Sequence, residues 1–294
     1  MQLQPVAQNL VFGILIGGLY GLAAVGLSLV FGVTKFLNIS HGELLMLGGY
    51  TGFWLFMLLG VDPFVGLPLV LLLLMLLGYL IYKLLFQRMV KLSDENKIKN
   101  TMLVGFGLGL VLQNVALKLW TADDRGITTA YSSKVLKFAG IRFPVVRLAS
   151  FVIALVLLLA LQAFLKRTYL GKAIRATVQD WEAAMLLGIN INRVYLVSFL
   201  LGAGLAGVAG ALVAVGYSIQ PGMGLEWTLK TLVVMVLGGL GSFVGTFVAG
   251  VLLGVTESLT SFWLGGTYRD IVALLLFLLV LILRPRGLFG AKEG

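Results

Sequence analysis

Polar side chains that could do chemistry are few in this 294-residue sequence, and four stand out because apolar residues surround them. Asn38, His41 and Glu43 cluster at the start of one apolar run, and Glu257 lies inside another. Ionisable groups inside apolar membrane segments are costly and usually functional. His41 and Glu43 are two residues apart and would not share a face of a regular helix, whereas Asn38 and His41 could.

We favour a structural role for these four residues. Asn38, His41 and Glu43 would hydrogen-bond loose helix ends or the backbone of a neighbouring subunit. Glu257 would anchor a buried hydrogen bond. The alternative for all four is contact with a solute along a transport pathway.

Signatures of enzymes are missing from the sequence. It has no G-x-x-x-x-G-K-[ST] stretch, and Gly171-Lys172-Ala173 lacks both the hydroxyl and the spacing of a phosphate-binding loop. It also has no H-E-x-x-H, no G-x-S-x-G and no cysteine, and only one histidine. We therefore expect no catalytic residues, no metal site, no cofactor and no nucleotide site within this chain.

The composition indicates an integral membrane protein. Hydrophobic residues make up 60% of the chain and charged residues only 12%, against about 25% charged in soluble domains; the mean hydropathy is +1.03. The formal charge of +10 does not indicate nucleic-acid binding, because the basic residues lie between apolar spans. There they would orient the chain in the bilayer.

The apolar spans predict an all-α, polytopic membrane protein with a single domain over residues 1–294. Spans of membrane-crossing length are expected at 10–33, 36–59, 64–86, 101–119, 148–165, 195–215, 227–263 and 271–283. The span 227–263 is interrupted by LGGLGS at 237–242, which favours two half-helices or a re-entrant hairpin. We expect seven full crossings plus this broken element, within a range of seven to nine membrane helices. A strand-like stretch covers 134–143.

Glycines at four-residue spacing mark helix-packing faces in two spans. They are Gly13, Gly17 and Gly21 in the first span and Gly105 and Gly109 in the fourth. Such spacing lets two membrane helices approach closely.

Lys and Arg counts in the short loops predict the orientation. The polar loop 88–99 holds four, including Lys91 and Lys97, and the segment 166–193 holds five. The tail adds Arg284, Arg286 and Lys292. We therefore place the N-terminus outside and these basic segments in the cytosol. The long loop 120–147, with five basic residues on the outside, is the exception.

The segment 166–195 is the longest polar interval with a helical pattern. Asp180 is a predicted N-cap, with Glu182 in the first turn, and Gly188 is a predicted stop. The resulting helix of about two turns is too short to be stable alone. Trp181, Ala184, Met185 and Gly188 would share one face, and Ala183, Ala184 and Gly188 are small enough for another surface to approach. Spacing alone leaves two interpretations open, a helix that docks a soluble partner and an ordinary amphipathic loop helix.

Four stretches together resemble the permeases of branched-chain amino acid ABC transporters, of the H type. They are FLNISHGELLMLGGY at 36–50, RATVQDWEAAMLLGI at 175–189, GGLGSFVG at 238–245 and RPRGLFG at 284–290. The first is similar to the family's N-F-A-H-G-E and M-x-G-x-Y pattern, with Ser40 in place of the usual Ala. The second is similar to the coupling segment of ABC importers. The likeness runs over nearly the whole chain in the same order, and urea and short-amide permeases look similar.

The resemblance implies half of an importer pore in the plasma (inner) membrane of a prokaryote. Its implied partners are a second permease subunit, expected as a heterodimer, two cytoplasmic ATPase subunits, an external solute-binding protein and membrane lipid. Residues 179–188 would couple the pore to the ATPase, through Gln179, Asp180, Trp181, Glu182, Ala183, Ala184, Leu187 and Gly188. A self-contained secondary transporter is the rival from another class.

Overall fold

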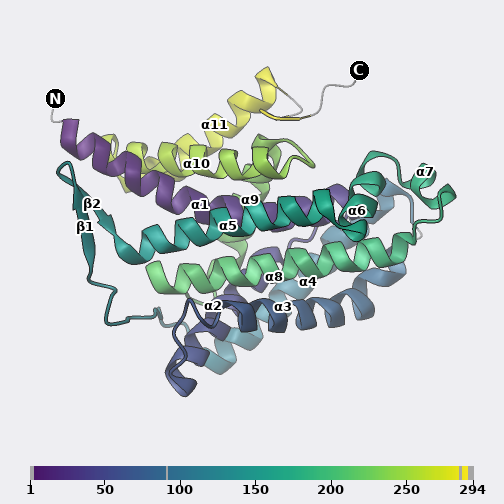
Figure 1. Ribbon diagram of the computed structural model, residues 1–294, viewed down its shortest axis with the longest axis horizontal. Coiled ribbons are helices and arrows are strands. Elements are labelled where there is room, and N and C mark those ends of the chain that lie inside the picture. Colours follow the sequence, from purple (N-terminus) through teal and green to yellow (C-terminus); the bar gives the residue numbers. More distant parts are fainter. Residues whose placement is uncertain (1–2, 91, 285–286, 291–294) are drawn as a thin grey trace.

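Long helices lie side by side along the longest axis of the computed structural model, which describes residues 3–90, 92–284 and 287–290 (Figure 1). Eight helices of this described part are long and apolar enough to cross a membrane, within the predicted seven to nine. The α-helices are α1 (Leu3–Thr34), α2 (His41–Leu59), α3 (Leu67–Ile81), α4 (Asp94–Trp120), α5 (Val145–Arg167), α6 (Tyr169–Gln179), α7 (Trp181–Leu186), α8 (Ile191–Gly216), α9 (Met223–Gly238), α10 (Phe243–Trp263) and α11 (Arg269–Leu283). Short π and 3₁₀ turns extend α3 through Tyr82–Phe86 and Gln87–Met89, and the 3₁₀ turn Gly266–Tyr268 precedes α11.

The glycine face of α1 packs directly on α10, as its spacing predicts. A Cβ added to Gly17 would lie 2.6 Å from the Cα of Val251, and Gly13 and Gly21 face the α10 backbone in the same way. Gly250 and Gly254 of α10 lie equally close to the backbone of α1. Backbones this close gain dispersion contacts along the whole interface. Gly105 of α4 differs from the prediction, because it faces Asn38 and Ile39 in the irregular stretch before α2, whereas Gly109 faces Ser40 and Glu43 at the start of α2.

The helix α2 begins beside the middle of α1. The chain leaves α1 at Lys35, whose φ of 58° is left-handed, and residues 35–38 have no regular structure. His41 then lies at Ala23, with 3.0 Å between its Nε2 and the Ala23 carbonyl oxygen. The predicted span 36–59 is therefore wrong over its first residues, because the chain folds back before the helix starts.

The predicted break in 227–263 is confirmed. It separates α9 from α10 at residues 239–242, where Gly239 and Gly241 have φ values of 95° and 87°. A Cβ on Gly32, near the end of α1, would lie 3.4 Å from the Cα of Gly241. The break therefore lies beside the C-terminal end of α1.

The loop expected at 88–99 is shorter than predicted. The helix α4 starts at Asp94, so Lys97 and Lys99 are helical. Of the other predicted loop and tail positions, Lys91, Pro285, Arg286 and Lys292 lie outside the described residues.

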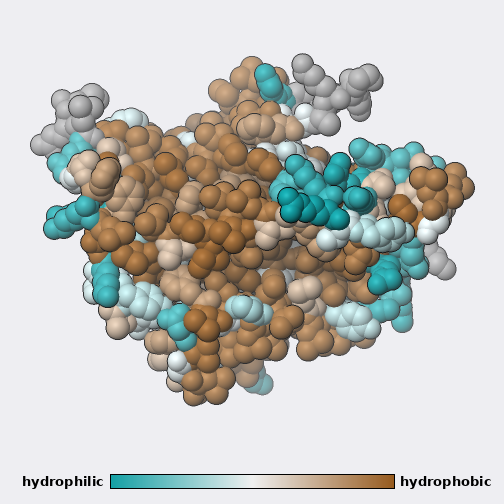
Figure 2. All heavy atoms as spheres, in the orientation of Figure 1, coloured by the Kyte–Doolittle hydropathy of each residue, from teal (hydrophilic) through white to brown (hydrophobic). Residues whose placement is uncertain are grey.

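The two ends of the molecule differ (Figure 1). At the hairpin end, strands β1 (Val135–Phe138) and β2 (Ile141–Pro144) pair antiparallel, with Val135 opposite Pro144, where strand-like sequence was predicted. Gln4 and Gln8 of α1 hydrogen-bond this hairpin through the carbonyl oxygens of Gly140 and Arg142. At the opposite end, the α7 end, lie α6 and α7. Between the ends, Figure 2 shows a broad apolar surface, with hydrophilic residues gathered near the two ends.

Candidate functional site

The helix α7 is a short, capped element at the α7 end. The Asp180 carboxylate accepts a hydrogen bond from the Ala183 N–H at 2.9 Å, so the predicted N-cap is present. Glu182 lies in the first turn, where a carboxylate stabilises the helix dipole. The chain turns at Gly188, which has a φ of 82° that favours glycine. The local structure predicted for this segment is therefore confirmed.

One face of α7 packs on the protein and the other is exposed. Ala184 is buried, while Met185, Leu186 and Leu187 are 52%, 86% and 82% exposed. The expected common face of Trp181, Ala184, Met185 and Gly188 is therefore wrong, because Ala184 faces inward and Met185 faces outward. In Figure 2 apolar side chains cover the far right tip, where Figure 1 places α7.

A buried lysine ties α7 to the membrane helices. The Nζ of Lys97 lies 5.4 Å from the ring centroid of Trp181 and 5.7 Å from that of Tyr195. It also donates a hydrogen bond to Asp94 at 3.0 Å. An ammonium group over aromatic faces is attracted by the ring quadrupoles, more strongly where water is excluded. Sequence reasoning counted Lys97 as a loop charge and missed this contact.

The helix α6, which sequence reasoning did not separate from the loop, supports α7. Thr168 caps it by accepting the Gly171 N–H at 3.0 Å, and Ile174 is fully buried. A cavity of about 280 Å³ separates α6 and the end of α5 from residues 241–244. Gln179 lines this cavity. The helix α6 thus lies beside the break between α9 and α10.

The side chains of Asn38 and His41 make hydrogen bonds at the irregular start of α2. The Asn38 side-chain oxygen accepts hydrogen bonds from the Ser40 N–H and hydroxyl at 3.1 and 2.6 Å. His41 reaches the Ala23 carbonyl with a ring nitrogen, which must then carry the proton. Thr228 of α9 accepts the Gly42 N–H and donates to the Ile39 carbonyl oxygen, each at 2.9 Å. These contacts favour the structural role over solute contact.

Glu43 stands apart from Asn38 and His41. Its carboxyl group packs against Gly224, and its Oε2 is buried without a hydrogen-bond partner among the described residues. It lines a small cavity of about 30 Å³ beside Gly109 and Leu225. The structure therefore does not join the three residues predicted in this region into one cluster.

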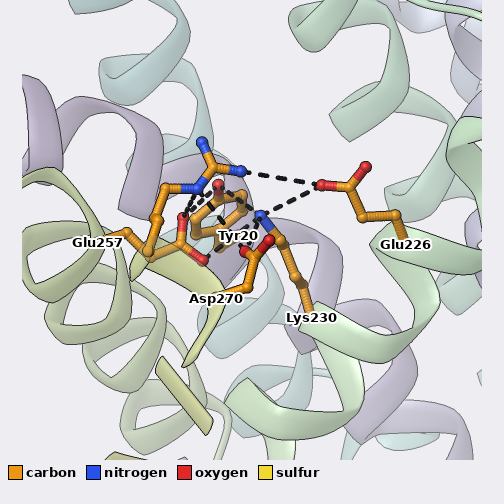
Figure 3. A network of polar contacts seen from close by, with 6 residues as sticks. Tyr20, Glu226, Lys230, Glu257 and Asp270 are labelled. Carbon is orange, nitrogen blue, oxygen red and sulfur yellow. Dashed lines mark hydrogen bonds and ion pairs between the residues drawn. The ribbon is translucent and has the colours of Figure 1, made fainter. Parts of the chain in front are cut away.

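Glu257 lies in a network of charged groups near the hairpin end (Figure 3). Its Oε2 accepts a hydrogen bond from the Tyr20 hydroxyl at 2.9 Å and lies 3.5 Å from Arg269 Nε. Its Oε1 lies 3.4 Å from Lys230 Nζ without a hydrogen bond. Glu226 and Asp270 complete the network through ion pairs with Lys230 at 3.3 and 3.6 Å. The predicted anchoring role fits Glu257, but sequence reasoning missed its partners; the i, i+4 pair of Glu226 and Lys230 was the available signal.

Known proteins resemble this chain over nearly its full length. The family model described as "Branched-chain amino acid transport system / permease component" matches residues 9–281. The permease protein BraD of a high-affinity branched-chain amino acid transport system, from Pseudomonas aeruginosa, is 31% identical over 97% of this chain and 96% of its own. LivH from Escherichia coli K12 is 30% identical over the same shares. LivM from Salmonella typhimurium is 28% identical over 92% of this chain and 67% of its own.

Proposed function

Because the chain belongs to the family of permease components of branched-chain amino acid transport systems, we propose that it forms half of the pore of an ATP-driven importer for these amino acids. It is a multi-pass inner-membrane protein and acts as a permease subunit. The observation that carries the proposed cargo is the full-length match to BraD and LivH, which are named for branched-chain amino acid transport. Relatives named LivH and LivM support a pair of permease subunits.

The exposed face of α7 is the proposed contact with a cytoplasmic ATPase. It presents Met185, Leu186 and Leu187 to solvent on a helix that its own chain already caps and supports. Exposed apolar groups of this size favour a protein partner. Of the small residues predicted for close approach, Ala183 and Gly188 are exposed, whereas Ala184 is buried against the rest of this chain.

The helix α4 is the proposed route by which α7 acts on the pore. Its first turns hold Lys97 against the ring of Trp181. Further along α4, Gly105 and Gly109 lie against the turn that precedes α2 and the first residues of α2. A displacement of α7 would therefore reach the turn at 38–40 and the start of α2 through one helix. Alternating access by rocking of helix groups is the mechanism we propose. ATPase subunits would supply the nucleotide site and an external binding protein would deliver the solute.

Reconstituted transport tests this function. Vesicles that contain both permeases and the ATPase subunits, with the external binding protein added, should accumulate leucine only with ATP. The chain alone should take up none, with or without an ion gradient; uptake by it alone would establish the rival secondary transporter. Uptake of urea or short amides in place of leucine would establish the related permease class.

Variants of α7 test the coupling role. Leu186→Asp should reduce ATP-driven uptake by about tenfold or more, because a carboxylate would have to be buried in the partner surface. Leu136→Asp is the control, since Leu136 is an exposed apolar residue of the hairpin. Glu182→Lys, or a bulky residue at Gly188, should uncouple ATP hydrolysis from uptake without loss of membrane insertion. Full uptake by all the α7 variants would contradict the assignment.

A further inference from the structure

One buried carboxyl group among the membrane-spanning helices has an oxygen without a partner. Glu43 lies in the first turn of α2 and is 4% exposed. Its Oε2 accepts no hydrogen bond in the described part of the chain, and no basic side chain of that part forms an ion pair with it. An ionisable group inside a membrane protein is costly and usually pairs with another group. A donor from another molecule would complete this pairing.

The cavity at Glu43 opens on a face that α4 and α9 share. It measures about 30 Å³, which is room for one water molecule or the end of one side chain. Its lining includes Phe106, Leu110 and Gln113, which share one face of α4 because they are four and three residues apart. Leu225 of α9 lies on the same rim and, like Phe106 and Leu110, is exposed. The α4–α9 face is defined here as Phe106, Leu110, Gln113, Asn114 and Leu225.

Polar side chains make the α4–α9 face unsuited to lipid. Gln113 and Asn114 lie within the apolar stretch 101–119 of α4, at membrane depth. Asn114 is exposed and donates a hydrogen bond to the Leu110 carbonyl oxygen at 2.7 Å, whereas its own side-chain oxygen accepts none from the described residues. Hydrocarbon supplies no partner for such groups. Leucines such as Leu72 cover the exposed side of α3, in contrast, and suit lipid.

We propose that the second permease subunit covers the α4–α9 face and donates a hydrogen bond to Glu43, from an ammonium, guanidinium, amide or hydroxyl group. The contact rests on the proposed function, in which two permease subunits form the pore, and it specifies the surface on which they meet. The face lies at membrane depth, which soluble ATPase and binding-protein partners do not reach. The helix α4 would then join the α7 end to the subunit interface.

A different chain fits this face better than a second copy of the same chain. In a symmetric pair of copies the same surface patch meets itself. The described residues that line the cavity offer a second carboxyl group and the Gln113 amide, but no Lys or Arg. Two copies would therefore bring like charges together, whereas another permease can supply a cation opposite Glu43.

Photo-cross-linking in the complete transporter tests the contact. The photoreactive amino acid p-benzoylphenylalanine in place of Phe106 should give a cross-linked product that contains both permeases, identified by a tag on the second one. The same amino acid in place of Leu72, on the exposed side of α3, is the matched control and should give no such product. A product of two copies of this chain from Phe106, or no protein product from Phe106, would overturn the contact. The second outcome would show that the face meets lipid.

Variants of Glu43 test the donor. Glu43→Met keeps the side-chain length and removes both acceptor oxygens. Co-purification of the second permease with this chain should then fall about tenfold or more, the loss expected for a hydrogen bond to a charged group. Glu43→Gln keeps one acceptor oxygen and should retain part of the association. Glu95→Met is the control, because the Glu95 side chain is 77% exposed, and it should leave the association unchanged.

Thermal unfolding of this chain purified alone separates loss of the contact from loss of the fold. Glu43→Met should leave the unfolding midpoint unchanged or raise it, because the Oε2 that it removes has no hydrogen bond within the described residues. Unchanged co-purification would overturn the donor. It would indicate a role within this chain if the midpoint falls, and a bound water if it does not.

ATP-driven leucine uptake by the same preparation separates the contact from the proposed function. Uptake without a cross-link from Phe106 to the second permease would count against the contact alone. The cross-link without uptake would count against the proposed function alone.

Discussion

Single buried side chains connect helices that are distant from one another in the sequence. Lys97 is 3% exposed and contacts residues of three helices, through Asp94 on α4, Trp181 on α7 and Tyr195 on α8. Its charge is held by one carboxylate and two aromatic faces. A lysine removed from water in this way is retained only where partners replace its hydration.

Loss of the Lys97 charge should loosen α7 without unfolding the membrane helices. Lys97→Met keeps the side-chain length and removes the cation–π attraction, which contributes about 0.5–2 kcal/mol. Backbone amides of residues 180–189 should then exchange with deuterium about two- to thirty-fold faster. Lys99→Met is the control, because the Lys99 side chain is 68% exposed and pairs with Glu95 on the helix surface. Equal exchange in both variants would show that Trp181 is held by packing alone.

At the scale of elements, helices touch through glycines whose Cα atoms leave no room for a side chain. Gly210 of α8 faces the Leu45 carbonyl of α2 so closely that a Cβ would overlap it. In contrast, a Cβ on Gly107 of α4 would meet no described atom within 4 Å beyond its chain neighbours and the backbone of its own helix.

These two glycines should therefore respond in opposite directions to the same change. Gly210→Ala should destabilise by at least about 1–3 kcal/mol, because the two backbones must separate. Gly107→Ala should be neutral or stabilising by up to about 1 kcal/mol, since alanine favours a helix over glycine. The thermal unfolding midpoint of the purified permease in detergent gives the comparison. A lower midpoint for Gly107→Ala than for Gly210→Ala would contradict the packing.

Elements with strong local signals could be predicted from the sequence, and those that depend on distant partners could not. The membrane spans, the break at 239–242, the Asp180 cap and the Gly188 turn each follow from a run of residues or one residue type. The late start of α2 could not be predicted, because it depends on Thr228, which lies 186 residues after Gly42. The partners of Glu257 lie up to 237 residues away. Apolar runs alone therefore could not separate a helix from an extended segment buried in protein.

At the scale of the whole molecule, apolar faces of α3, α4 and α11 are exposed, as in Leu72, Leu103 and Ile282. These faces suit lipid or the second permease. Positively and negatively charged residues lie at both the hairpin end and the α7 end. The counts of Lys and Arg in the loops predict that the α7 end faces the cytosol.

Cysteine accessibility tests this orientation. In intact cells a membrane-impermeant thiol reagent should label Ser133→Cys and should label Leu186→Cys only after permeabilisation. Ser133 lies in the loop before the hairpin, and Leu186 is 86% exposed on α7. The native chain supplies the blank, because it has no cysteine. The reverse labelling pattern would invert the topology and remove α7 from any cytoplasmic ATPase.

The start of α2 also bears on the order in which the chain is assembled during synthesis. Its Gly42 N–H is satisfied by Thr228, 186 residues later, and the glycine face of α1 meets α10 later still. When only the first two helices have been synthesised, the Gly42 N–H therefore has no Thr228 to bond, and lipid hydrocarbon cannot replace that hydrogen bond. The glycine face of α1 is also not yet covered by α10. The start of α2 and the glycine face of α1 therefore reach their final packing only after α9 and α10 have been inserted.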